Sequence, residues 1–166
     1  LDPNLVVSSC LPAIVGAASC VVGSSTSLTI PAQSLVENQR SRMVLMLVSG
    51  ASASNVSSAS FNSQSMTLIR RQQDSNGEGN TTELWGIRDI NLPVASGSYS
   101  GAFTGGPVGA AMCLLAINEV EQVFPAALIP ADTGPNNGSA GSGARTTTIS
   151  SQANNSLIVV GTSFDS

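Results

Sequence analysis

The feature that most constrains this chain is a repeated pattern of short apolar and β-branched runs separated by Gly, Pro, Asn and Ser. Such runs are typical of β-strands, and the residues between them are those that tight turns need. No stretch combines capping residues with the apolar spacing of an amphipathic helix. The pattern predicts strands at residues 13–22, 27–31, 42–49, 56–61, 65–72, 81–90, 97–104, 109–120, 144–151 and 156–164. About ten short strands predict an all-β chain, an antiparallel β-sandwich of the jelly-roll or Ig-like kind.

The predicted strands are of two kinds. The strand at 97–104 alternates, with Tyr99 and Phe103 on one face, and is therefore expected to be half-buried. By contrast, residues 43–48, 112–115 and 157–160 are apolar on both faces. We expect one face of such a strand to lie in the core and the other against a loop, a sugar or another subunit.

The charge of the chain excludes several partners. Only 10 % of its residues are charged, against roughly a quarter in ordinary soluble domains, and the net charge is −4. The six basic residues are all arginines and are scattered, which argues against nucleic acid. No apolar run approaches the roughly 18–20 residues of a membrane helix, so no membrane insertion is expected. A weakly charged chain rich in Ser, Thr, Gly and Asn is typical of an extracellular or cell-surface protein, here expected to be secreted after removal of a signal peptide.

Catalytic chemistry is not indicated. A Ser-His-Asp or Cys-His arrangement is excluded because the chain has no histidine, and no phosphate-binding loop or zinc pattern is present. Glu119 and Glu121 share a strand face, but a solvated pair is favoured over acid–base work. Residues 74–78 resemble a fragment of a calcium loop that lacks the distal acidic ligand, and an ordinary turn is favoured. We therefore expect no enzyme, no cofactor and no metal.

The cysteines and the Asn residues offer candidates for covalent modification. An odd number of cysteines, three, predicts either one disulfide and one buried thiol or an intermolecular bond. Cys10–Cys20 is the favoured disulfide, and Cys113 is expected in the core. The N-x-S/T pattern of N-glycosylation occurs at Asn55, Asn80, Asn137 and Asn154. Asn80 is the preferred acceptor, since Glu78 completes a stricter E-x-N-x-T pattern at a predicted hairpin tip.

An apolar triplet stands alone near the start of the chain. Leu5, Val6 and Val7 follow a turn-like Asp-Pro-Asn and precede Cys10. We divide the chain into an extension at residues 1–11, a candidate donor strand, and one sandwich domain at residues 12–166. The extension can pair with a neighbouring copy, pair within its own sheet, or hang free; the sequence leaves these alternatives open.

The middle of the chain resembles a β-sandwich domain of secreted bacterial surface proteins. The resemblance is carried by Phe61, residues 64–68, 83–85 (ELW), Pro93, Gly97, Tyr99 and 119–122, and covers roughly residues 13–164. Members of that family continue with further closing strands, whereas this chain stops at Ser166 and carries the extra residues 1–11. The resemblance implies an extracellular structural or adhesive module without catalytic residues, and the departures suggest strand exchange between subunits.

The favoured function is a structural subunit of an extracellular, pilus-like filament, in which copies of the chain are held by strand donation. The glycans at the N-x-S/T sites are further candidate partners. The alternatives are an adhesin or carbohydrate-binding module of a larger surface protein, and a capsid or tail decoration protein of a virus. For the carbohydrate-binding alternative, Trp85 is expected to be a core residue rather than a stacking platform.

Overall fold

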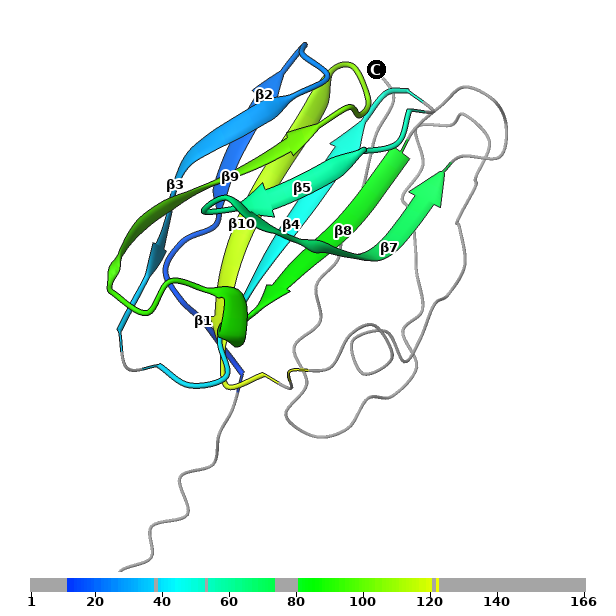
Figure 1. Ribbon diagram of the computed structural model, residues 1–166. Helices are drawn as coiled ribbons and strands as arrows, with labels where there is room; N and C mark the ends of the chain where they lie inside the picture. Colours follow the sequence, from blue (N-terminus) through cyan, green and yellow to red (C-terminus); the bar gives the residue numbers. More distant parts are fainter. Residues whose placement is uncertain (1–11, 38, 53, 74–80, 121, 123–166) are drawn as a thin grey trace, which may run out of the picture.

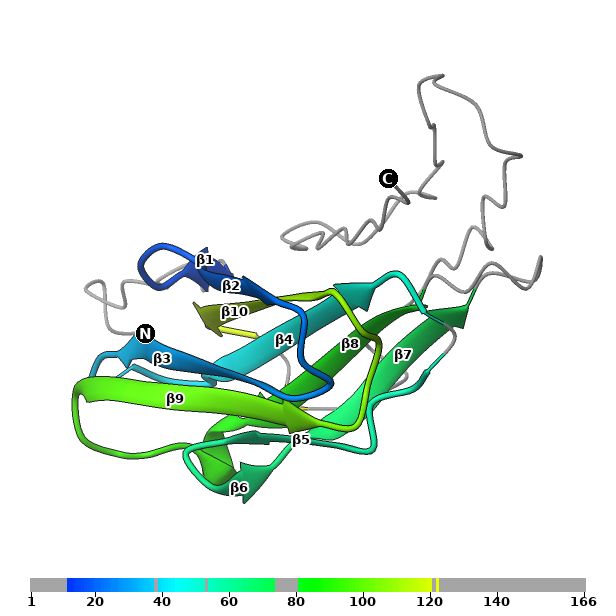
Figure 2. The same ribbon diagram turned by 90° about the horizontal axis from the view of Figure 1, so that it is seen from above.

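Two antiparallel sheets pack face to face in a computed structural model of the chain, which describes residues 12–37, 39–52, 54–73, 81–120 and 122 (Figure 1). Figure 2 shows the two layers from above. Sheet A contains β1 (Ala13–Ile14), β2 (Ser19–Gly23), β4 (Met43–Gly50), β7 (Thr67–Gln73), β8 (Thr81–Arg88) and β10 (Ala110–Asn118). Sheet B contains β3 (Leu28–Leu35), β5 (Ser58–Phe61), β6 (Gln64–Ser65) and β9 (Gly97–Thr104). One short 3-10 helix, η1 (Asp89–Asn91), follows β8.

The strand pairing is that of a jelly roll rather than an Ig-like sandwich. β2 pairs with β10, β3 with β9, β4 with β8, and β5 with β6. Each pair therefore joins a strand before the β5–β6 turn to one after it, and the pairs are nested in order, as in one long hairpin rolled into two sheets. β7 is added at the edge of sheet A beside β8. The predicted antiparallel sandwich is confirmed.

β9 shows why sheet B has one buried face. Gly101 and Phe103 are buried towards sheet A and Tyr99 is half-buried, whereas Ser98 and Ser100 are exposed on the other face. The ring of Tyr99 meets that of Phe61 edge to face, with centroids 6.3 Å apart. The two-residue period of the sequence thus places the apolar side chains between the sheets. The outward-facing side chains of β9 are small and uncharged.

β4 is buried on both faces, as its unbroken apolar sequence predicts. Val44, Met46 and Val48 face sheet B and belong to the core between the sheets. Met43 and Leu45 point to the opposite side and belong to a second apolar cluster. Sheet A therefore has an apolar surface on each of its two faces at β4.

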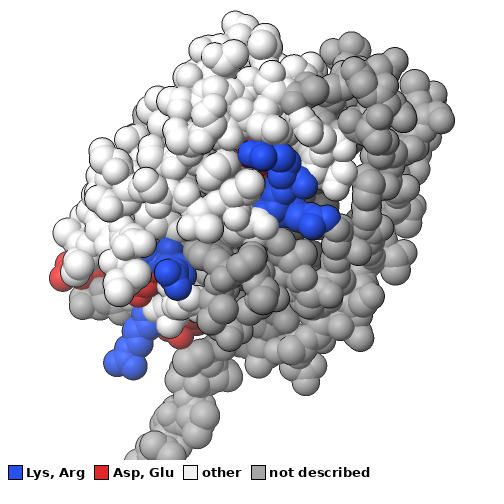
Figure 3. Space-filling model, turned by 45° about the vertical axis from the view of Figure 1, so that its right-hand side comes forward, with Lys and Arg blue, Asp and Glu red and all other residues white. Residues whose placement is uncertain are grey.

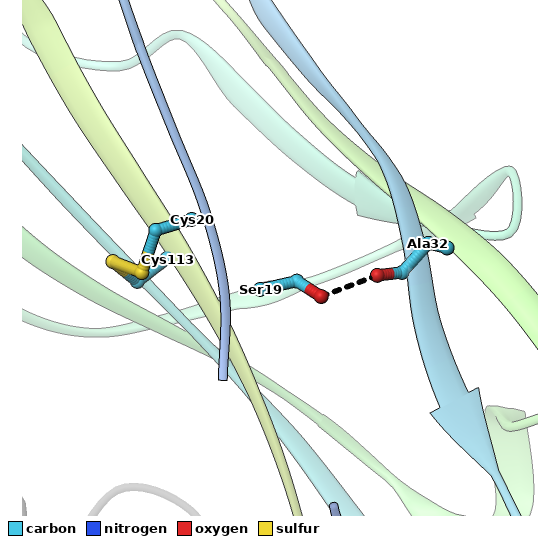
Figure 4. Close-up of a disulfide and its surroundings, with 4 residues drawn as sticks. All are labelled: Ser19, Cys20, Ala32 and Cys113. Carbon is cyan, nitrogen blue, oxygen red and sulfur yellow. Dashed lines mark hydrogen bonds between the residues drawn. A yellow bond between two sulfur atoms is a disulfide. The ribbon is translucent and has the colours of Figure 1, made fainter. Parts of the chain in front are cut away.

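β3 is an edge strand that is protected against pairing. Pro31 lies in its middle and supplies no N–H, and the register with β9 shifts between Ile30 and Gln33. On the side of β3 away from β9, the Ser19 hydroxyl donates to the carbonyl oxygen of Ala32 at 2.5 Å (Figure 4). This contact ties β2 of sheet A to β3 of sheet B and joins the two sheets along this side.

The disulfide prediction was wrong. Cys20 is bonded to Cys113, not to Cys10, and the two residues are 93 positions apart in sequence (Figure 4). The register of β2 on β10 places Cys20 directly opposite Cys113, with a Cα–Cα distance of 4.1 Å. The expected place of Cys113 in the core was also wrong. Met112 and Leu114, on either side of it in β10, point into the core, so Cys113 points to the other face of sheet A.

Candidate functional site

The point where the N-terminal extension joins the sandwich is fixed by the pairing of β1. Ala13 lies opposite Asn118 and Ile14 opposite Ile117, at the last two residues of β10. Because the pair is antiparallel, the chain before Ala13 leads beyond the end of β10. The described chain therefore begins beside the last residue of β10.

The end of β10 is itself well defined. Glu119 has a φ of 55°, a left-handed conformation that interrupts the strand. Its N–H donates to the carbonyl oxygen of Arg40 at 3.1 Å, and the next N–H, of Val120, donates to the carbonyl oxygen of Ser41 at 3.1 Å. The chain after Asn118 is thus bonded to the loop between β3 and β4. Glu119 lies outside β10, so the predicted strand face shared with Glu121, which is outside the described residues, is not formed by this strand.

The same end of the sandwich carries a depression of about 690 Å³ in the loops after β8. Its polar groups bond to one another: Arg42 Nε lies 2.7 Å from Asp89 Oδ1, and Gln122 accepts a hydrogen bond from the Asp89 N–H at 2.9 Å. Ile90 and Val94 line it and are 85 % and 78 % exposed. The bonded polar groups hold the loops together, and the exposed lining combines the apolar Ile90 and Val94 with Arg88.

A buried carboxylate lies near the other end of β8, away from the depression, and joins three segments of the chain. Glu83 of β8 is fully buried; its Oε1 accepts hydrogen bonds from Arg71 Nε and the Val56 N–H, both at 2.9 Å. Its Oε2 accepts from Trp85 Nε1 at 2.8 Å and from Arg71 Nη2 at 3.3 Å. The E-L-W motif therefore joins β7, β8 and the segment before β5 through one carboxylate, which is a structural role.

This network was missed in the sequence, although a signal for it exists. Glu83 and Trp85 are two residues apart in a predicted strand and must share a face. Because Trp85 is expected in the core, where the structure places it at 7 % exposure, the carboxylate beside it needs a cationic partner. Arg71, on the preceding predicted strand, was available for that role.

The predicted site residues are only partly described. Leu5, Val6, Val7 and Cys10 lie outside the described residues, as do Asn80, Asn137 and Asn154. Asn55 is described and is exposed in the connection between β4 and β5. Its sequon continues into Val56, which is buried beside Glu83.

The charged side chains of the described sandwich are unevenly distributed. β3, β5, β6 and β9, the strands of sheet B, contain no charged residue. Figure 3 shows Arg side chains in separate groups on a surface that is otherwise mostly uncharged. Within the described ranges there is no group of His, Cys, Asp and Glu that could hold a metal ion. No helix in this part of the chain is long and apolar enough to span a membrane.

Comparison of the chain with protein-family models, with curated proteins and with solved structures finds no match in any of the three.

Proposed function

We propose that the chain is an extracellular structural subunit that forms filaments with copies of itself, each copy lending residues 1–11 to the next. The observation that supports the proposal is the pairing of Ala13 with Asn118, which places the start of the described chain at the end of β10. An extended chain covers about 3.3 Å per residue, so Leu5, Val6 and Val7 can reach roughly 20–25 Å beyond that end. That distance is enough to reach a neighbouring copy.

The chemistry of the extension suits strand addition. Main-chain hydrogen bonds give an added strand its affinity, and alternate side chains give it register. A strand donated from one end of a subunit to a different surface of the next makes a head-to-tail contact, which propagates into a fibre if it does not close into a ring. The Cys20–Cys113 disulfide is compatible with an oxidising, extracellular location.

Carbohydrate binding is less well supported. Sugar sites commonly use an exposed aromatic face, but Trp85, Phe61 and Phe103 are buried. Tyr99 packs on Phe61, and its hydroxyl donates to the carbonyl oxygen of Ala95 at 2.8 Å. In the described part of the chain, these side chains are used for packing. Attached glycans stay a prediction, for which the exposure of Asn55 is favourable.

Assembly should depend on the apolar side chains of the extension. We expect the intact chain to form fibres in negative-stain images, and expect deletion of residues 1–11 to leave a monomer. The strands and the core that the structure describes include none of the deleted residues, so the truncated chain should still fold. The paired substitution Leu5→Asp with Val7→Asp should abolish fibres, because charged side chains cannot fill apolar pockets.

The matched control places the same two charges directly after the apolar triplet. Ser8→Asp with Ser9→Asp should retain fibres, because these positions are already polar. A monomeric intact chain, or fibres that persist after deletion of residues 1–11, would contradict the proposal.

A further inference from the structure

A second apolar cluster lies on the face of sheet A that points away from sheet B. We call it the outer cluster; it consists of Met43, Leu45, Ile69, Ile117 and Val120, with Leu84 and Leu115 packed against it. The cluster draws residues from β4, β7, β8 and β10 and from the segment after β10. It therefore crosses most of the width of sheet A.

The outer cluster is buried within a single copy of the chain. Met43 is 0 % and Leu45 5 % exposed, values typical of a protein interior. Val22 of β2, on the same face of the same sheet, is 76 % exposed. None of the described strands lies over this face, since sheet B packs on the other one (Figure 2). The face is thus covered over β4 and β8 and open over β2.

Three longer stretches outside the described residues could supply the cover. Residues 74–80 contain no large apolar side chain. Residues 1–11 join the sheet at β1, on the side where the outer face is open. Residues 123–166 follow closely after Val120, which is itself a member of the outer cluster. The position of Val120 therefore favours the last stretch.

Within residues 123–166, two segments are apolar. Residues 123–130 contain Pro125 and Pro130, which cannot donate to a sheet ladder. Residues 156–164 contain the unbroken run Leu157, Ile158, Val159 and Val160, mostly β-branched and apolar on both faces. We propose that residues 156–164 of the same chain pack across the outer cluster and form a third layer on the sandwich.

This inference does not rest on the proposed function. It assigns the outer cluster to the chain's own C-terminal segment, so the extension of a neighbouring copy must dock elsewhere. Burial of the large apolar side chains of the outer cluster stabilises the fold in proportion to the apolar area removed from water, as burial in the main core does.

Photo-crosslinking in the full chain tests the assignment directly. Leu84→p-benzoylphenylalanine places the probe at the half-buried edge of the outer cluster, and Val22→p-benzoylphenylalanine is the control on the open part of the same face. Mixing unlabelled and ¹⁵N-labelled chains before irradiation distinguishes crosslinks within one copy from crosslinks between copies. The probe at position 84 should crosslink to residues 156–164 of its own copy, and the probe at position 22 should not. A crosslink from position 84 to residues 123–130, to residues 1–11 or to another copy would overturn the proposal, as would no crosslink.

A second measurement covers the case in which the probe perturbs folding. Binding of an apolar dye should rise several-fold when the C-terminal run is made polar by Leu157→Ser, Ile158→Ser, Val159→Ser and Val160→Ser. The matched change Phe124→Ser with Leu128→Ser should leave dye binding near that of the unchanged chain. If dye binding instead rises with Phe124→Ser and Leu128→Ser and not with the four C-terminal substitutions, the outer cluster is covered by residues 123–130 and the proposal is wrong. Since fibre formation is scored separately, failure here and failure of strand donation are distinguishable.

Discussion

Glu83→Gln is expected to lower the free energy of unfolding by about 3 kcal/mol, because it breaks a buried, charge-assisted network. Each carboxylate oxygen of Glu83 accepts two hydrogen bonds, one of them from Arg71. Whichever oxygen becomes an amide nitrogen then faces two donors and can accept from neither. The substitution also leaves the Arg71 guanidinium without its counter-charge.

Urea unfolding followed by Trp85 fluorescence measures this loss, because the indole is part of the network. The matched control is Glu37→Gln, at an exposed position, which should change the stability by less than about 0.5 kcal/mol. If Glu83→Gln and Glu37→Gln cost the same, the buried network does not stabilise the fold.

Removal of the Cys20–Cys113 disulfide should cost about 2–5 kcal/mol, since the bond closes a long loop in the unfolded chain. The two cysteines are separated by 93 positions, and the bond links β2 to β10 near the start and the end of the described sandwich. The variant Cys20→Ser with Cys113→Ser should therefore unfold at lower urea concentration than the unchanged chain. Reduction of the unchanged chain should give a similar shift.

Cys10→Ser separates this pairing from the one expected from the sequence. It should leave the stability unchanged, and alkylation of the unfolded, unreduced chain should modify Cys10 alone. A stability loss in Cys10→Ser equal to that in the double variant would instead indicate a Cys10–Cys20 bond.

Most of the strands could be predicted because local sequence determines them. The predicted strand at 97–104 matches β9 in both bounds, and Tyr99 and Phe103 share one face, as its alternation predicts. The strand predicted at 27–31 was ended too early at Pro31. Proline is tolerated in an edge strand, and β3 continues to Leu35 with a shift of register. The predicted strand at 13–22 is divided into β1 and β2.

Pairing between distant strands could not be predicted in this way. Cys10 and Cys20 are ten positions apart in the sequence, whereas the register of β2 on β10 brings the distant Cys113 opposite Cys20. The jelly-roll order likewise depends on contacts between residues far apart in the chain. Such contacts depend on how all the apolar faces pack together, which no single segment specifies.

The fold alone does not assign a function, since jelly rolls occur in proteins of many kinds. Assembly by strand donation is proposed from one local feature, the pairing of Ala13 with Asn118 at the end of β10. The E-L-W motif, which resembles part of a bacterial sandwich family, is explained without any ligand by the bonds of Glu83. Its role in this chain is to stabilise the fold.

The most direct test of strand donation is a chain-termination measurement. Copies that lack residues 1–11 keep the acceptor surface but have no strand to lend, so they should cap one end of a growing fibre. Mean fibre length, measured in negative-stain images, should fall steadily as the ratio of truncated to intact copies rises. If the truncated copies cannot accept a strand, the mean fibre length stays the same at every ratio. That result would contradict donation in trans.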